Sequence, residues 1–261
     1  MSIPDPVRPD RIAPNRIAPD QIDQDSQPAA ELHSENRLTG RSIRSFVVRN
    51  GRTTAAQTDA LQRLLPKFGL KFRETTINLA EAFDREGPAW MEIGFGNGDV
   101  LLSMATSNPD TNILGAEVHE SGIGHALIGV EQHNLSNVRL VQHDAMEILE
   151  SMLEPASLDK VLLLFPDPWH KKRHHKRRIV QQDFLNAVAR TLKPGGILHC
   201  ATDWAEYGEW MIERLEQDDR FINCAGPGQG SERPAWRPVT RFEKRGHRLG
   251  HDVIDLLYSR S

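Results

Sequence analysis

Short apolar runs alternate with amphipathic stretches from residue 90 to the end of the chain. Six runs have the length and aliphatic character of buried strands, at 90–93, 112–118, 138–142, 160–165, 196–202 and 253–259. The stretches between them have helical spacing, at 98–107, 122–133, 145–152, 178–192 and 204–217. Strands and helices that alternate in this way form right-handed crossovers, with helices on both faces of a parallel sheet. The pattern therefore predicts an α/β protein with a doubly wound sheet.

The N-terminal part of the chain has a different texture. Residues 1–40 are rich in Pro, Asp, Gln and Ser, a composition that buries too little apolar surface to offset the entropy of ordering the chain. We expect a disordered tail there, and the alternative is an arm that orders on a partner. From residue 41 onward, 42–48 favours a strand, 53–65 has helical spacing up to Pro66, and 77–83 favours a further helical turn. We therefore expect one domain over 41–261 with an N-terminal extension.

Composition narrows the class of protein. The chain of 261 residues has two cysteines, too few for a disulfide framework, and neither lies in a CxxC pair. No apolar stretch approaches the roughly 20 residues that span a bilayer, and the first 35 residues contain no apolar segment typical of a signal peptide. These features predict a cytoplasmic protein. The irregular spacing of its histidines predicts no metal site.

The net charge hides an uneven distribution. The formal charge is −4, but seven acids and four bases within 1–40 account for −3, which leaves −1 for the rest of the chain. Bases gather in two segments, 170–178 and 233–248, and the first of these has six Lys or Arg, three His and no acid. A run of this kind is typical either of a solvated helix face or of a surface that holds phosphate groups.

A glycine-rich turn follows the first predicted strand. Gly94 and Gly96 lie between this strand and the next helix, where glycine permits a tight turn and a close approach of the backbone to a nucleotide. Glu117 ends the second strand, where a carboxylate suits a ribose, and Asp144 follows the third. Glu92, just before the turn, repels a pyrophosphate and favours a ligand with a positive end, such as S-adenosylmethionine. NAD is the alternative ligand.

The fourth predicted strand ends in a turn where Asp167 lies between two prolines, and the basic segment 170–178 follows directly. Open α/β sheets bind ligands at the carboxyl ends of their strands, so this position favours a phosphate-binding surface over a solvated face. Asp167 is a poor core residue and a good partner for the edge of a base. Trp169 either stacks on a base or closes the core.

Taken together, these motifs resemble the tRNA (guanine-N7-)-methyltransferase family of class I S-adenosylmethionine-dependent methyltransferases. The resemblance is strongest over Pro166-Asp167-Pro168-Trp169-His170-Lys171-Lys172-Arg173-His174, and further motifs match in order at 43–46, 92–98, 192–196, 201–204 and 240–246. It implies a Rossmann-like sheet of the class I type, mostly parallel with an antiparallel C-terminal strand. It also implies methyl transfer from S-adenosyl-L-methionine to N7 of a guanine in the variable loop of tRNA.

The resemblance implies a role for each matching position. Asp167 is the implied catalytic residue, and the implied cofactor-binding residues are Glu92, Gly94, Gly96, Glu117, Asp144 and Asp167. The implied substrate-binding residues are Lys171, Asp203, Thr240, Arg241, Phe242 and Glu243. The implied RNA-binding residues are Arg173, His174, His175, Lys176, Arg177 and Arg178. The implied partner is tRNA, with no metal and no membrane, for a protein that acts as a monomer or a homodimer.

Three other interpretations of the same residues stay open. An amino methyltransferase has a proline-rich turn after the fourth strand, but it normally places Asp or Asn before Pro-Pro and an aromatic residue, without a basic block. An RNA-binding protein could keep the fold without turnover, although the four acids at 92, 117, 144 and 167 argue against such decay. The third is a dehydrogenase, which follows from NAD as the ligand.

Overall fold

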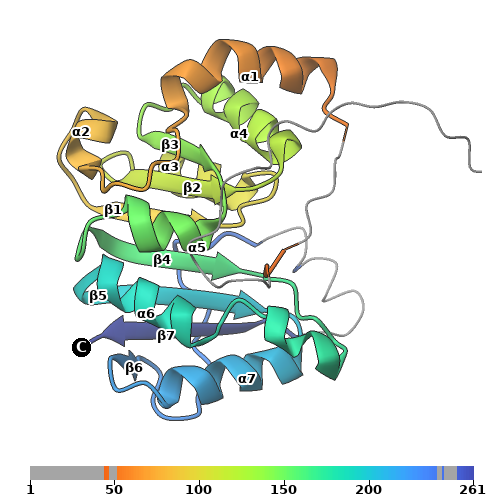
Figure 1. The fold of residues 1–261 in the computed structure, drawn as a ribbon, viewed down its shortest axis with the longest axis vertical. Coiled ribbons are helices and arrows are strands. Elements are labelled where there is room, and N and C mark those ends of the chain that lie inside the picture. Colours follow the sequence, from red (N-terminus) through yellow and green to blue (C-terminus); the bar gives the residue numbers. More distant parts are fainter. Residues whose placement is uncertain (1–43, 47–51, 240–242, 244–251) are drawn as a thin grey trace, which may run out of the picture. The chain divides into compact units, whose positions relative to one another are not determined.

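The computed structural model of the protein describes residues 44–46, 52–239, 243 and 252–261. The predicted tail, 1–40, lies outside these residues. All described residues belong to one unit, 43–261, whose strands and helices alternate along the chain (Figure 1). Within the described ranges, no helix is both long enough and apolar enough to cross a membrane.

One seven-stranded sheet contains every strand of the described residues. The strands are β1 (Ala89–Ile93), β2 (Asn112–Glu117), β3 (Val138–Gln142), β4 (Leu158–Leu164), β5 (Leu192–Thr202), β6 (Phe221–Asn223) and β7 (Ile254–Arg260). They are ordered β3-β2-β1-β4-β5-β7-β6. The pairs from β3 to β5 are parallel, whereas β7 runs antiparallel to both β5 and β6. The predicted doubly wound sheet, mostly parallel with an antiparallel C-terminal strand, is confirmed.

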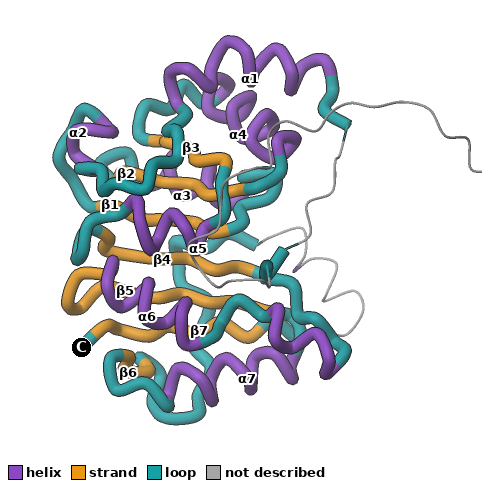
Figure 2. Tube along the Cα trace, in the orientation of Figure 1, coloured by secondary structure: helices purple, strands orange, loops and turns teal. Residues whose placement is uncertain are grey.

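Helices lie on both faces of this sheet (Figure 2). On one face are α1 (Ala55–Phe68), α3 (Asp99–Ser107) and α4 (Glu120–Gln132). On the other are α2 (Leu79–Phe83), α5 (Ala145–Glu147) with the π-helical turn η1 (Ile148–Met152), α6 (Gln182–Thr191) and α7 (Ala205–Glu216). Side chains along β4 alternate between the two cores, with Val161 and Leu163 in one and Leu162 and Leu164 in the other. A central strand buried on both faces is therefore continuously apolar, as its sequence indicates.

The structure corrects two of the predicted helix boundaries. Helix α1 does not end before Pro66 but continues to Phe68, because proline near the C-terminal end removes only one intrahelical hydrogen bond and Phe68 is buried in the core. The helix predicted from Arg178 begins instead at Gln182. Residues Lys172–Arg177 form a separate 3-10 helix, η2, and Arg178 after it has extended backbone geometry with a ψ angle of 132°.

Two further local predictions need correction. The strand predicted over 42–48 is described only at 44–46, which form a bend and no strand. Strand β6 was not predicted, because three residues have no readable periodicity and the strand exists only through its pairing with β7.

Asn137 ties the end of α3 to the starts of β2 and β3. This side chain is 3% exposed, and its amide nitrogen lies 2.9–3.1 Å from the carbonyl oxygens of Ala105, Asn108 and Thr111. These carbonyls belong to the last turn of α3 and to the loop that follows it, where helical partners run out. One side chain therefore closes the connection between a helix and two strands.

Replacing Asn137 with alanine is expected to lower the free energy of unfolding by about 2–4 kcal/mol, because three carbonyl oxygens lose their donor. Denaturant unfolding measures the change. The matched control is Asn186→Ala, which removes an exposed amide whose oxygen accepts from Arg220 and is expected to cost less than about 1 kcal/mol. Equal losses in the two variants would contradict the role assigned to Asn137.

Candidate active site

A cavity of about 370 Å³ opens at the carboxyl ends of β1 to β4. The order of the strands reverses between β1 and β4, and open α/β sheets bind ligands in the crevice beside such a switch point. Five of the six predicted cofactor-binding residues line the cavity: Gly94, Gly96, Glu117, Asp144 and Asp167. They come from four separate strand ends, so the topology rather than the local sequence brings them together.

The glycine turn shapes the first wall of this cavity. Gly94 and Gly96 have φ angles of +67° and +57°, and a Cβ at either position would meet no atom within 4 Å. Their backbone therefore borders open space and leaves room for a ligand. On the other side, Gly122 of α4 lies so close that a Cβ there would be 2.4 Å from the Gly96 carbonyl oxygen. The turn is thus held from behind by the start of α4.

Glu117 forms the second wall and orders the loops around it. Its carboxylate accepts hydrogen bonds from the backbone N–H groups of Gly96, Val118 and His119, at 2.7–3.0 Å. These bonds join the glycine turn after β1 to the turn after β2. The residue is 7% exposed and keeps its position at the edge of the cavity.

Glu92 lies in β1 and, unlike the other predicted cofactor-binding residues, does not line the cavity. It is 3% exposed, and its Oε2 atom has no hydrogen-bond partner among the residues that the structure describes. Burial, together with the charges of Glu117 and Asp99, raises the pKa of Glu92 from an ordinary 4.5 to about 8. A buried carboxyl without a counter-charge is a favourable neighbour for a cationic ligand.

Asp144 starts α5 at the other end of the cavity. One oxygen of its carboxylate accepts from the backbone N–H of Met146 at 3.0 Å, which caps the helix. Its neighbour His143 also lines the cavity, stacked on Phe72 with ring centroids 3.7 Å apart and hydrogen-bonded to Glu147. The pairing of His143 with Phe72 was not predictable from the residues alone, since 71 positions separate them in the chain.

The turn after β4 holds two residues in uncommon backbone conformations. Phe165 and Trp169 have φ angles of +54° and +47°, in the left-handed region that non-glycine residues rarely adopt. Each such residue costs on the order of 1–3 kcal/mol, and such residues concentrate at functional sites. Asp167 lies between them and lines the cavity.

A second cavity, of about 510 Å³, adjoins the first. It is lined by Pro168 and the aromatic and basic residues that follow, including Trp169, Lys171 and His174. Asp167 and His119 line both cavities. The predicted catalytic residue therefore borders both cavities.

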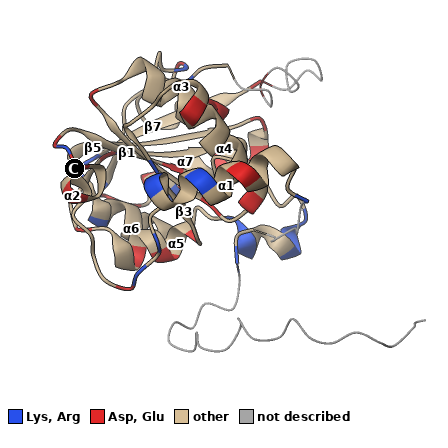
Figure 3. Ribbon diagram, turned by 90° about the horizontal axis from the view of Figure 1, so that it is seen from above, with Lys and Arg blue, Asp and Glu red and all other residues tan. Residues whose placement is uncertain are grey.

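The basic segment divides into exposed and inward-facing side chains; its Lys and Arg positions are blue in Figure 3. Lys171, Lys172, Arg173 and Lys176 are exposed, whereas His174, His175 and Arg177 are half-buried. Desolvation, together with the cationic neighbours of His174, lowers the pKa of this imidazole. The exposed side chains form a surface available to a polyanion.

Arg178 does not fit the predicted contact with RNA, because only 1% of the residue is exposed. Its guanidinium donates to both carboxylate oxygens of Glu206, at 3.0 and 2.6 Å, and to the Pro168 carbonyl oxygen at 2.9 Å. It also lies over the rings of Tyr207 and Trp210. Arg178 is thus an internal anchor between the turn after β4 and helix α7.

Arg177 and Trp169 fix the turn from the other side. The guanidinium of Arg177 lies 4.1 Å from the centroid of the Trp169 ring and donates to the carbonyl oxygen of Phe46 at 3.1 Å. The indole N–H of Trp169 donates to the carbonyl oxygen of Ser45 at 3.2 Å. Ser45 and Phe46 both line the first cavity. This stacking occupies one face of Trp169, while the residue still lines the second cavity.

The predicted substrate-binding residues are only partly within the described structure. Lys171 lines the second cavity, and Asp203 follows β5, next to the end of β4 but outside the lining of either cavity. Glu243 is 6% exposed and paired with Arg237. Thr240, Arg241 and Phe242 lie outside the described residues.

Sequence reasoning missed His119, which lines both cavities, and Arg237, which holds Glu243. The first follows Glu117 by two residues, a spacing that could have marked it as a neighbour of the cavity. In the sequence, Arg237 is only one of several bases in the segment 233–248. In the part of the chain that the structure describes, no group of three or more His, Cys, Asp or Glu side chains could hold a metal ion.

Comparison with known proteins gives the family. Residues 86–256 match the sequence profile of a family described as "Putative methyltransferase". A tRNA (guanine-N(7)-)-methyltransferase from Alcanivorax borkumensis is 49% identical over 231 residues, which cover 87% of this chain and 97% of that protein. The enzyme of the same name from Methylococcus capsulatus is 49% identical over 221 residues, or 85% of this chain and 95% of that protein.

A solved structure, that of TrmN from Thermus thermophilus, is 19% identical and covers 70% of this chain and 47% of that chain, with a TM-score of 0.49. A likeness this weak supports no conclusion about function. The sequence relatives are decisive, because they combine high identity with nearly complete coverage. The chain belongs to the tRNA (guanine-N(7)-)-methyltransferase family.

Proposed function

We propose that the protein transfers a methyl group from S-adenosyl-L-methionine to N7 of a guanine in the variable loop of tRNA, forming N7-methylguanosine. Relatives that match most of the chain bear the name of this activity. The observation that supports it most directly is that Asp167 lines both cavities, which suits the transfer of a group from one ligand to another. One cavity would hold the methyl donor and the other the guanine.

The residues around the first cavity fit S-adenosylmethionine, which has a cationic end and an adenosine end. The unpartnered buried oxygen of Glu92 suits the cationic end, and the open space in front of Gly94 and Gly96 leaves room for the ligand backbone. We assign Glu117 to the ribose hydroxyls and Asp144 to the adenine. A carboxylate has about four acceptor sites, so Glu117 can accept from hydroxyls while it holds the two loops.

When bound, S-adenosylmethionine supplies a methyl group activated by a positively charged sulfur. Guanine N7 has a lone pair and no proton, so no side chain has to act as a base toward the attacking nitrogen. The chain has to hold N7 in line with the methyl group and to compensate the positive charge that develops on the purine. We assign both tasks to Asp167, which would accept from the N1 and N2 hydrogens of guanine, with Asp203 and Glu243 as helpers.

The tRNA would lie across the exposed part of the basic segment. Lys171, Lys172, Arg173 and Lys176 provide mobile cations for the phosphate backbone, at the edge of the second cavity. Arg177 and Arg178 hold the segment in shape from the inside. A tRNA substrate would place the protein in the cytoplasm, and we propose residues 41–261 as the methyltransferase domain.

Asp167→Asn is expected to lower the rate of methyl transfer by about 100-fold or more, because the carboxylate no longer compensates the charge on the purine. Single-turnover assays with labelled S-adenosylmethionine and unmodified tRNA measure the rate. Binding of tRNA is expected to change much less, and Asp219→Asn, in the loop before β6, serves as the control. Near-normal turnover in Asp167→Asn would remove this residue from the catalytic role.

Exposed and buried bases of the basic segment are expected to behave differently. The triple variant Lys172→Gln, Arg173→Gln and Lys176→Gln is expected to weaken tRNA binding and to reduce the slope of log affinity against log salt by about 2–3, with little change in melting temperature. Arg178→Gln is expected to lower the melting temperature, because Glu206 and the Pro168 carbonyl lose their donor. Filter binding at several salt concentrations, together with thermal unfolding, separates the two effects. An unchanged salt slope in the triple variant would show that these side chains only face solvent.

Glu92→Gln is expected to change how stability depends on pH. The pKa of Glu92 in the folded, ligand-free protein is about 8, above its ordinary 4.5, so its contribution to stability is complete below pH 4.5 and is lost as pH rises through 8. Glutamine imitates the protonated carboxyl at every pH. The free energy of unfolding of the variant should therefore match that of the wild type near pH 5 and exceed it near pH 8, by on the order of 3 kcal/mol.

Denaturant unfolding at several pH values tests this expectation, with the exposed Glu120→Gln as the control. Glu92→Gln is also expected to bind S-adenosylmethionine more weakly, as calorimetry would measure, since the amide offers no charge to the cationic end. Parallel stability curves for the variant and the wild type would refute the raised pKa.

A further inference from the structure

The segment between β6 and β7 contributes a buried cation, Arg237. Arg237 is 2% exposed and its side chain is 0% exposed, which makes it one of the largest fully buried side chains of the described residues. Its neighbour Trp236 packs against the hydrophobic cluster on the face of the sheet that carries α1, α3 and α4, and its ring centroid lies 6.4 Å from that of Trp90.

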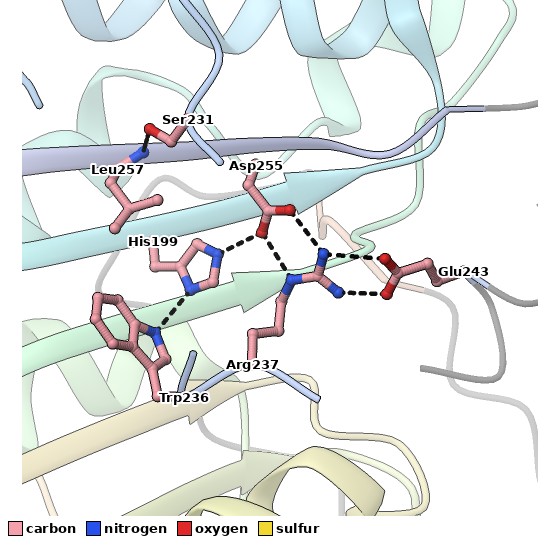
Figure 4. A network of polar contacts seen from close by, with 7 residues as sticks. All are labelled: His199, Ser231, Trp236, Arg237, Glu243, Asp255 and Leu257. Atoms are coloured by element: carbon pink, nitrogen blue, oxygen red, sulfur yellow. Dashed lines mark hydrogen bonds and ion pairs between the residues drawn. The ribbon is translucent and has the colours of Figure 1, made fainter. Parts of the chain in front are cut away.

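Arg237 joins two carboxylates from different parts of the chain (Figure 4). Its Nε and Nη2 atoms donate to the two oxygens of Asp255, at 2.7 and 2.6 Å. Its Nη1 and Nη2 atoms donate to the two oxygens of Glu243, at 2.6 and 3.4 Å. Both carboxylates are nearly buried, at 3% and 7% side-chain exposure. The planar fork of arginine can serve two carboxylates at once, whereas the point charge of a lysine cannot reproduce this geometry.

Arg237, Asp255 and Glu243 together form a clamp, and its Asp255 side is fixed to the sheet. The buried His199 of β5 contacts Asp255 through Nε2 at 2.8 Å, and its Nδ1 atom receives the indole N–H of Trp236 at 3.3 Å. Because Nδ1 accepts, Nε2 carries the proton and donates to Asp255. Desolvation lowers the pKa of His199, which favours this neutral form. Burial alone would raise the pKa of Asp255, but its bonds with His199 and Arg237 outweigh burial and hold that pKa below its ordinary value.

The clamp lies beside the wall of the first cavity. Asp255 pairs with Ala201 across β7 and β5, and the carbonyl oxygen of Ala201 accepts from the backbone N–H of Phe165 at 2.7 Å. The guanidinium of Arg237 lies 5.8 Å from the ring centroid of Phe165, which lines that cavity. Phe165 precedes Asp167 by two residues. Arg237, which holds Glu243, therefore lies close to the turn that carries Asp167.

We infer that Arg237 is a positioning residue, which fixes the carboxylate of Glu243 at the edge of the guanine site by anchoring it to Asp255. The inference rests on the proposed function, in which Glu243 helps to bind the guanine. Arg237 itself is buried and touches neither ligand; it acts through Glu243. Its loss would let Glu243 leave the site while the cofactor residues at β1, β2 and β3 stay in place.

A double-mutant cycle tests this inference with Arg237→Lys, Glu243→Gln and the double variant. Each single variant is expected to lower kcat/KM for tRNA by about tenfold or more, and the double variant is expected to fall within about threefold of Arg237→Lys alone, because both changes break one link. The dissociation constant for S-adenosylmethionine, measured by calorimetry, is expected to stay within about twofold of the wild type. Arg220→Lys, in a partly exposed arginine–aspartate pair with Asp218, is the matched control.

Two results would overturn the inference. One is an Arg237→Lys enzyme with normal kcat/KM while Glu243→Gln is impaired. The other is a purely structural pattern. In that pattern Arg237→Lys weakens the binding of S-adenosylmethionine as much as it lowers tRNA methylation, and the fold-loss of kcat/KM in the double variant equals the product of the two single losses. If Arg237→Lys does not fold, Asp255→Asn loosens the same clamp from the sheet side, and the same kinetic pattern is required of it.

The design separates this inference from the proposed function. The wild type and Arg220→Lys must both form N7-methylguanosine from S-adenosylmethionine and tRNA. If neither does, the proposed function fails. If both do and Arg237→Lys matches them, only the positioning role of Arg237 fails.

Discussion

Parallel pairing of β1 with both β2 and β4 is the constraint on which the rest of the structure depends. The chain builds the sheet outward from β1 in one direction through β2 and β3, and then returns to its other side with β4. The connections after β1 and β4 therefore leave in opposite directions and open a crevice between them. Glu117 and Asp167 line this crevice because each lies at or just after the carboxyl end of one of these strands, whereas Glu92, near the end of β1, is buried and does not line it.

Buried charge is used in two contrasting ways around the crevice. Arg178 and Arg237 are buried but fully paired, the first with Glu206 and the second with Asp255 and Glu243. Such paired cations bring distant segments together with a defined geometry, which an apolar contact does not impose. Glu92 is the opposite case, a buried carboxyl with an unpartnered oxygen and a pKa raised to about 8. Among the described residues, the positioning cations Arg178 and Arg237 are thus paired, whereas Glu92 keeps an unpartnered oxygen that suits a cationic ligand.

Much of the fold and part of the site could be predicted from the residues. The strands from 90 onward follow from apolar runs, and the glycine turn and the acids at the strand ends follow from the same pattern, because parallel strands bring their carboxyl ends to one edge. Arg178 shows where this reasoning stops. In sequence it is one more base in a cationic run, but in the structure the backbone turns after η2 and directs its side chain inward to Glu206. Burial depends on what packs against a residue, and a charge run does not contain that information.

The sequence by itself determined the alternation of strands and helices, the glycine turn and the family, because these features are local or are written in motifs of neighbouring residues. Only the tertiary structure decided that Asp167 borders two cavities, that Trp169 is stacked by Arg177, and that Arg237 clamps Glu243 to the sheet. These arrangements join residues that are far apart in the chain or whose side chains could point either way. Their geometry follows from strand order and packing, which depend on the whole chain at once.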